Sequence, residues 1–156
     1  MMVTAFVSLG SNLNHPEMQL DHAISAIKDF PETFFISISS KNYTQFVGAE
    51  NQPDVLNAVL QIKTGLPAEV LMEKLLEQEK QQGRLRSETS RYVGRTIDLD
   101  LLLYDHLILN TKQLTLPHPK LYEREFVLTP LAEIASGFVL PNGQTVQQCL
   151  ALLLSQ

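Results

Sequence analysis

The stretch that decides the fold is GRTIDLDLLLYD, residues 94–105. Its apolar residues predict a β-strand that enters a hydrophobic core, yet Asp98 and Asp100 interrupt the apolar run. Successive side chains of a strand point to opposite faces, so both carboxylates leave one face, with Cα atoms roughly 6.6 Å apart, while Ile97, Leu99 and Leu101 line the other. This spacing fits either a solvated strand face, the commoner case, or a site for a hard cation such as Mg²⁺.

The segment before this strand is rich in arginine. Four of the five arginines, Arg84, Arg86, Arg91 and Arg95, lie in RLRSETSRYVGR, residues 84–95. Guanidinium groups bind phosphate oxygens, and carboxylates beside them can hold a divalent metal, so the combination favours phosphoryl-transfer chemistry over a solvated loop. The formal net charge of −5 argues against general nucleic-acid binding.

The composition is that of an ordinary folded domain. The chain has 156 residues, of which 44% are hydrophobic and 19% charged, and we expect a single domain spanning residues 1–156. No apolar run approaches the roughly 20 residues needed to span a bilayer, so no membrane partner is expected. With Cys149 as its single cysteine the chain forms no internal disulfide, which fits a cytoplasmic location.

The remaining periodicities predict an α+β fold. Strands are expected at 4–10, 33–45 and 55–63, and helices from Pro16 to about residue 30 and from Pro67 to Gly83. Together with the strand of the two aspartates, this gives the βαββαβ order of a ferredoxin-like core. Additional C-terminal strands at 107–110 and 113–116 and helices at 125–135 and 145–155 follow it. Because this fold hosts many functions, it does not decide the chemistry.

Two further residues are candidates for ligand contacts. His118 lies between Pro117 and Pro119 in a rigid loop, where a ligand contact and an ordinary loop role are equally compatible with the sequence. Asn57 lies in an apolar strand and must hydrogen-bond if it is buried, either to the backbone or to a ligand. The sequence contains no G-x-x-x-x-G-K-[ST] nucleotide loop.

Several segments together resemble one known family. They are VSLGSNL, NQPDVLNAV, QQGRLR, GRTIDLDLLLYD, LTLPHPKLYEREFVLTPLAEIA and LPNG, and they cover nearly the whole chain in the same order. This pattern is similar to that of the 6-hydroxymethyl-7,8-dihydropterin pyrophosphokinases of the folate pathway. The resemblance implies a monomeric enzyme of ferredoxin-like fold that transfers pyrophosphate from ATP, its co-substrate, to the hydroxymethyl oxygen of the pterin and releases AMP.

The resemblance also implies roles for individual residues. Asp98 and Asp100 would bind two Mg²⁺ ions, and Arg84 and Arg95 would act with them as catalytic residues on the triphosphate. Further ATP contacts would come from Glu79, Arg86, Leu101, Thr115, His118 and Arg124. The pterin would contact Thr44, Val47, Asn57, Tyr92 and Phe126, with Asn57 bonding its edge and Phe126 stacking on its ring.

The chain departs from the family pattern at Val55, where an aromatic residue often forms the second face of the pterin site. Leu76, Gln113 and Pro119 likewise replace residues that often help to hold ATP. Two other functions are weighed beside pyrophosphate transfer. One is a metal-dependent phosphohydrolase, and the other is a non-enzymatic ferredoxin-like module that binds RNA, which the acidic net charge disfavours.

Overall fold

The computed structural model describes residues 1–45, 52–83 and 96–156. The strands are β1 (Val3–Ser11), β2 (Thr33–Ile38), β3 (Asn42–Thr44), β4 (Val55–Thr64), β5 (Asp98–Tyr104), β6 (Leu109–Asn110) and β7 (Thr115–Leu116). The helices are α1 (Pro16–Lys28), α2 (Ala68–Gln81), η2 (Leu121–Glu123), α3 (Glu125–Ala135) and α4 (Val146–Leu154). Apart from the division of the second predicted strand into β2 and β3, this order confirms the βαββαβ core with additional C-terminal strands and helices.

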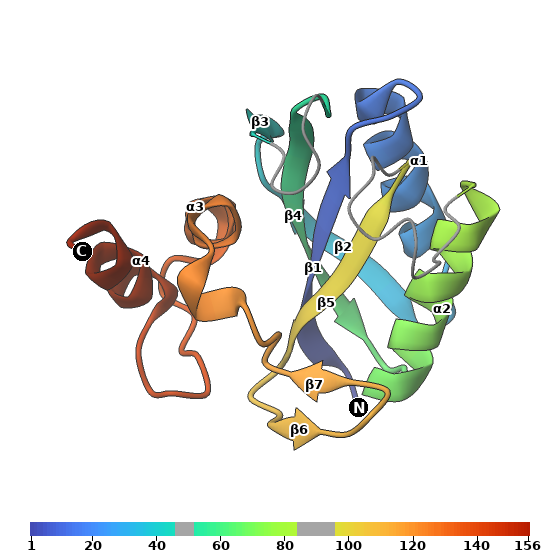
Figure 1. Ribbon diagram of the computed structural model, residues 1–156. Helices are drawn as coiled ribbons and strands as arrows, with labels where there is room; N and C mark the ends of the chain where they lie inside the picture. The colour runs from blue at the N-terminus through green and yellow to red at the C-terminus, as the bar shows by residue number, and fades with distance from the viewer. Residues whose placement is uncertain (46–51, 84–95) are drawn as a thin grey trace.

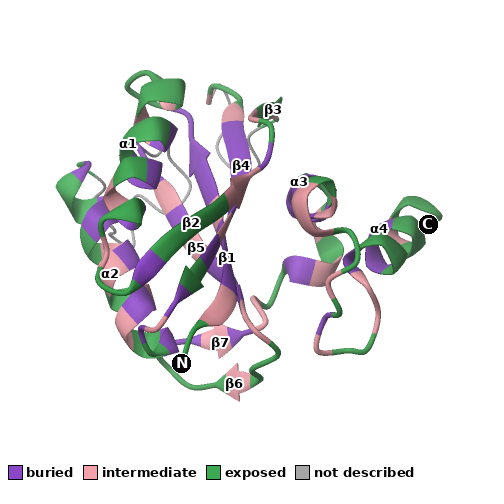
Figure 2. Ribbon diagram, turned by 180° about the vertical axis from the view of Figure 1, so that it is seen from behind, coloured by how far each residue is buried: buried purple, intermediate pink, exposed green. Residues whose placement is uncertain are grey.

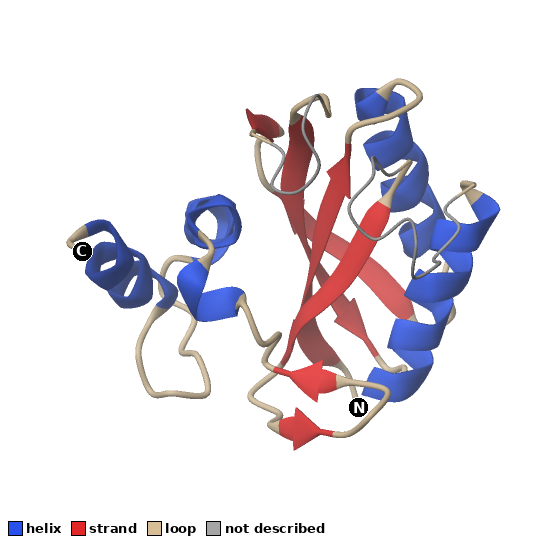
Figure 3. Ribbon diagram, viewed as in Figure 1, coloured by secondary structure: helices blue, strands red, loops and turns tan. Residues whose placement is uncertain are grey.

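The main sheet is antiparallel, with the strand order β2-β4-β1-β5 and with β3 also paired to β4. Helices α1 and α2 cover one face, and α3 and α4 lie on the other, which gives three layers (Figure 1, Figure 3). Each helical layer shares one core with the sheet. One cluster joins α1 and α2 to the sheet through residues such as Leu20 and Leu71, and the other joins α3 and α4 through residues such as Phe6 and Leu128.

The three consecutive leucines of β5 serve both cores because the strand contains a β-bulge. Phe6 pairs with Leu103 and Val7 with Leu101, so Leu102 is an extra residue in the ladder. Leu101 therefore packs in the α1/α2 cluster, whereas Leu102 and Leu103 both pack in the α3/α4 cluster. Simple alternation would place Leu101 and Leu103 on the same face of the strand. The bulge at Leu102 moves Leu103 to the other face, so all three leucines are buried.

The prediction of one strand over residues 33–45 is wrong, because the segment forms two strands, β2 and β3, that pair with opposite ends of β4. Ser39 separates them. Its amide donates to the carbonyl oxygen of Val59, and its hydroxyl accepts from the Val59 amide at 2.9 Å and donates to the carbonyl oxygen of Ser40. A side-chain oxygen thus replaces a main-chain partner, and the backbone leaves the ladder there. Figure 2 shows that β2 is largely exposed, whereas β4 beside it is buried.

We expect Ser39→Ala to destabilise the fold, because the buried Val59 amide loses its hydroxyl acceptor. The loss in the free energy of unfolding should be about 1–3 kcal/mol, measured by urea denaturation. Ser155→Ala is the control, since it removes only an exposed hydroxyl bond to the carbonyl oxygen of Leu152, and its effect should stay within about 0.5 kcal/mol. Equal effects of the two substitutions would contradict this account of Ser39.

Candidate active site

The candidate site lies on the sheet face that also carries α3 and α4. Directly opposed residues of an antiparallel pair share a face, and the register places Asn42, Asn57, Gly10 and Asp98 in one row across β3, β4, β1 and β5. The next row contains Asp100, opposite Ser8. At a strand spacing of about 4.8 Å, Asn57 and Asp98 stand roughly 10 Å apart, and Gly10 between them has no side chain to fill the gap.

A pocket of about 400 Å³ opens at the Asn57 end of this row. Strands β3 and β4 form one wall, and the first turns of α3 form the other. Its lining residues are Asn42, Thr44, Asn57, Glu125, Phe126, Thr129 and Pro130. The pocket therefore unites Thr44, Asn57 and Phe126, three residues that the sequence resemblance assigned to the pterin.

The side chain of Asn57 is held in a defined orientation. Its Nδ2 donates to the hydroxyl of Thr44 at 2.7 Å and to the carbonyl oxygen of Val55 at 3.0 Å. Both bonds use the amide nitrogen, so the amide carbonyl oxygen is the atom that Asn57 offers to an N–H donor of a ligand. The sequence predicted that Asn57 would bond either to the backbone or to a ligand. The structure shows a backbone partner, the carbonyl oxygen of Val55, and also the side-chain hydroxyl of Thr44.

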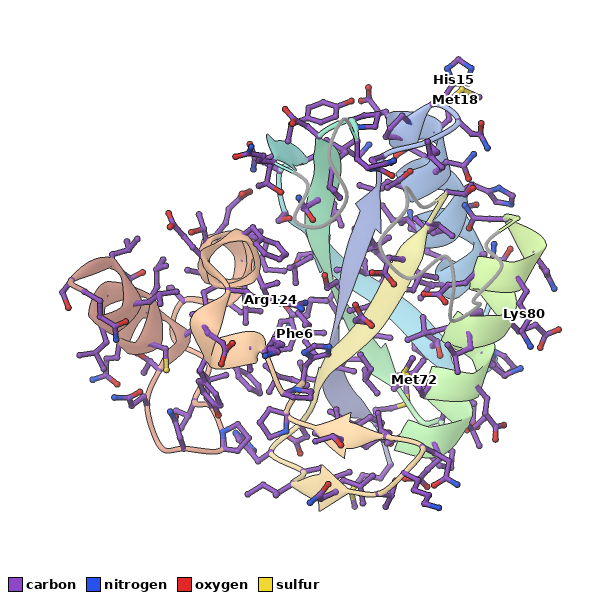
Figure 4. All side chains as sticks on the ribbon, in the orientation of Figure 1. Phe6, His15, Met18, Met72, Lys80 and Arg124 are labelled. Carbon is purple, nitrogen blue, oxygen red and sulfur yellow. The ribbon has the colours of Figure 1, made fainter. Side chains whose placement is uncertain are left out.

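Phe126 supplies an aromatic surface at the start of α3. The residue is 37% exposed, so part of its ring is accessible to a ligand. The Arg124 guanidinium lies over it, 5.6 Å from the ring centroid, in a cation–π contact. Figure 4 shows Arg124 between α3 and the sheet. A planar ligand in the pocket would therefore meet an aromatic face close to a positive charge.

At the other end of the row, Asp98 and Asp100 are half-buried while Leu99 between them is fully buried. The Leu99 amide points away from β1 and donates to Oε2 of Glu79 at 2.7 Å. Glu79 comes from α2 and is 1% exposed, so its carboxylate holds the backbone of β5 between the two aspartates. Asp98, Asp100 and Glu79 each also take part in further interactions within the chain.

His118 is attached to the same strand. Its amide donates to the carbonyl oxygen of Leu102, the bulged residue of β5, at 2.9 Å. Its Nδ1 accepts from the Lys120 amide at 3.1 Å, which assigns the ring proton to Nε2. The pKa of His118 is lowered from 6.5, mainly because burial disfavours the charged ring and next because Arg124 is close, while Asp98 acts in the opposite direction. At neutral pH the ring is therefore an uncharged Nε2–H donor near Asp98 and Arg124.

Comparison with known proteins connects this geometry to a family. The family model described as 7,8-dihydro-6-hydroxymethylpterin-pyrophosphokinase (HPPK) matches residues 6–136. The chain belongs to the HPPK family.

Curated HPPK relatives cover almost the whole chain. The 2-amino-4-hydroxy-6-hydroxymethyldihydropteridine pyrophosphokinase of Haemophilus influenzae is 44% identical over 147 residues, which are 94% of this chain and 91% of that protein. The protein of the same name from Pseudomonas aeruginosa is 36% identical over 97% of this chain and 92% of its own length.

A solved HPPK-DHPS structure in complex with substrates shares the fold with a TM-score of 0.73 at 10% identity. The match covers 99% of this chain and 44% of that one. This likeness confirms the ferredoxin-like α+β architecture. None of the helices in the described ranges has the length and apolarity that crossing a bilayer requires.

Not every residue predicted for the site can be placed. Val47, Arg84, Arg86, Tyr92 and Arg95 lie outside the described residues, so their roles stay predictions. The side chain of Leu101 is 2% exposed in the α1/α2 core, which means that only its backbone could reach a nucleotide. Thr115 is half-buried in β7, which packs against β5.

Four pocket residues were missed by the sequence reasoning. Asn42 precedes Thr44 by two residues in β3, so strand alternation places both on one face. Thr129 and Pro130 follow Phe126 by three and four residues in α3, so they share its helix face. Glu125 is the first residue of that helix. Asn42, Thr129 and Pro130 could therefore have been predicted from their sequence spacing to Thr44 and Phe126.

The lowered pKa of His118 can be tested by NMR titration. We expect its ring protons to titrate below 6.5, the ordinary value for a histidine. The pH dependence of the free energy of unfolding follows from the pKa of His118 being lower in the folded chain than in the unfolded chain. As pH falls below 6.5 the unfolded chain takes up a proton first, so the free energy of unfolding decreases until the lower folded pKa is reached. A titration midpoint for His118 at or above 6.5 would contradict the burial of the neutral ring.

Proposed function

We propose that the row from Asn57 to Asp98 carries out the reaction of the HPPK family, in which pyrophosphate moves from ATP to 6-hydroxymethyl-7,8-dihydropterin in folate biosynthesis. The pterin lies in the Asn57 pocket, and the ATP phosphates lie over Asp98 and Asp100. The observation that supports this most strongly is the shared face of Asn57 and Asp98, separated by Gly10. A pterin at one end and a triphosphate at the other would meet over that glycine.

The pocket matches the chemistry of a pterin. Its volume of about 400 Å³ lies within the range of small-ligand sites, and a pterin is a flat heteroaromatic ring with N–H donors along one edge. The carbonyl oxygen of Asn57 can accept from that edge, and the exposed ring of Phe126 can stack on its face. Val55 does not supply a second aromatic face, so Phe126 carries the stacking in the part of the pocket described.

The acid pair suits Mg²⁺. This cation typically binds through one or two protein carboxylates, with substrate phosphates and waters as its other ligands, and Asp98 and Asp100 offer two half-buried carboxylates on one strand face. Mg²⁺ held there would offset the negative charge of the ATP phosphates. Glu79 contributes by fixing the backbone at Leu99, between the two ligands.

The reaction forms a bond between the hydroxymethyl oxygen and the β-phosphorus of ATP. The bond from that phosphorus to the oxygen bridging it to the α-phosphorus breaks, and AMP leaves with the bridging oxygen. The hydroxyl loses its proton to solvent or phosphate. His118 donates from Nε2 to a phosphate oxygen, and Arg124 adds positive charge on the same side. Positioning and electrostatics carry most of the catalysis in such transfers, so a strong general base is not required.

The experiment that tests this function is product analysis with ATP, Mg²⁺ and 6-hydroxymethyl-7,8-dihydropterin. We expect AMP and the pterin diphosphate in equal amounts, with AMP formed only when the pterin is present. ADP and inorganic phosphate formed without pterin would instead indicate the phosphohydrolase. The monomeric state and the cytoplasmic location stay predictions, and size-exclusion chromatography with light scattering tests the former.

Replacing Asp98 with asparagine tests the metal site. Asp98→Asn keeps the shape of the side chain but removes its charge, so turnover should fall by at least about 100-fold while the circular dichroism spectrum and melting temperature stay close to those of the parent. Asp105→Asn is the matched control. Asp105 lies just beyond the opposite end of β5, where its carboxylate contacts His106, so the same loss of charge occurs away from the site. Near-normal turnover in Asp98→Asn would exclude the carboxylate as a required metal ligand.

A further inference from the structure

The two walls of the Asn57 pocket belong to different layers of the protein. Asn42, Thr44 and Asn57 stand on the sheet, whereas Phe126, Thr129 and Pro130 stand on α3. The distance between the walls decides whether a planar ring can contact Phe126 and Asn57 together. Val127, Leu128 and Leu131 pack the buried side of α3 into the cluster that also contains Phe6 and Val59 of the sheet, but they do not line the pocket.

A hydrogen-bonded clasp joins the walls beside the pocket. Glu133 lies one helical turn beyond Thr129, and Ser40 lies two residues before Asn42. The Ser40 amide donates to Oε2 and Oε1 of Glu133 at 2.8 and 3.1 Å, and the Ser40 hydroxyl donates to Oε2 at 2.9 Å. All three bonds are exposed to solvent, and they are charge-assisted because the acceptor is a carboxylate.

The strand side of the clasp is itself fixed by its neighbours. Ser39 exchanges hydrogen bonds with Val59 in β4. The ammonium group of Lys41 contacts Asp21 of α1 at 2.6 Å, on the opposite face of the sheet. Three consecutive residues therefore bind three different elements: Ser39 binds β4, Ser40 binds α3, and Lys41 binds α1. Glu133 is thus attached to a segment that is itself bonded to β4 and to α1.

We propose that Glu133 is a positioning residue that sets the width of the pterin pocket through its clasp on Ser40. This inference rests on the proposed function, because it assumes that the pterin occupies the Asn57 pocket. Glu133 does not line the pocket, so its effect reaches the ligand through the position of α3 and of Phe126. A wall held at the correct distance before binding lowers the ordering cost of binding, which raises affinity without changing the transfer step.

Steady-state kinetics of Glu133→Ala test the proposal. We expect KM for the pterin to rise roughly three- to tenfold, while kcat changes by less than about twofold and KM for ATP stays unchanged. Glu133→Gln keeps an oxygen acceptor and should restore part of the pterin KM. Glu73→Ala removes an exposed carboxylate from α2, on the other face of the sheet, and should leave all three parameters unchanged.

A double-mutant cycle with Ser40→Ala separates the clasp from a general loss of stability. Ser40→Ala should raise the pterin KM in the parent background and have no further effect in the Glu133→Ala background, because the hydroxyl bond is absent there. An unchanged pterin KM in Glu133→Ala, or an equal loss in kcat and both KM values, would overturn the clasp. A parent protein that forms no AMP with the pterin would instead overturn the proposed function.

Discussion

The constraint on which the site depends is the pairing register of β1 with its two neighbours. Gly10 is opposite Asn57 in β4 and Asp98 in β5, so the Asn57 pocket and the carboxylates of Asp98 and Asp100 share one face of the sheet. A slip of one residue in β5 would turn Asp98 and Asp100 into the α1/α2 core and Leu99 onto the site. Burial of an uncompensated carboxylate is costly, so Leu99 and Leu101 in the core secure the register that the chemistry requires.

The C-terminal additions turn this sheet face into a site. A ferredoxin-like core presents one open face, and here η2, α3 and α4 cover part of it while the first turns of α3 stand over β3 and β4 (Figure 1). The loop before them brings His118 to β5, where its amide binds the carbonyl oxygen of Leu102. An exposed aromatic ring, an oriented amide, a neutral imidazole and two carboxylates thus come from separate segments that meet only in the folded chain.

Local periodicity predicted the elements well but not the contacts between them. The alternation around Asp98 and Asp100 indicated their shared face, and Pro16 and Gly83 marked the start of α1 and the end of α2. The break between β2 and β3 was missed because it depends on the Ser39 hydroxyl reaching Val59, which lies 20 residues further along the chain. The pairing of Asn57 with Gly10 and the approach of Phe126 are likewise long-range facts. The apolar strand around Asn57 marked that residue as a candidate, but only the resemblance to a family pointed to Phe126 and to a shared ligand.

The bulge at Leu102 makes the leucine run of β5 sensitive to length and tolerant of composition. Any of the three leucines could be exchanged for another aliphatic residue of similar volume, because each needs only to fill its cluster. Deleting one of them would remove the extra residue from the β1–β5 ladder. The bulged carbonyl that accepts from the His118 amide would be lost, and Tyr104 would shift relative to β1. Among natural variants of this fold, the run should therefore vary in which aliphatic residues it contains and resist insertions and deletions.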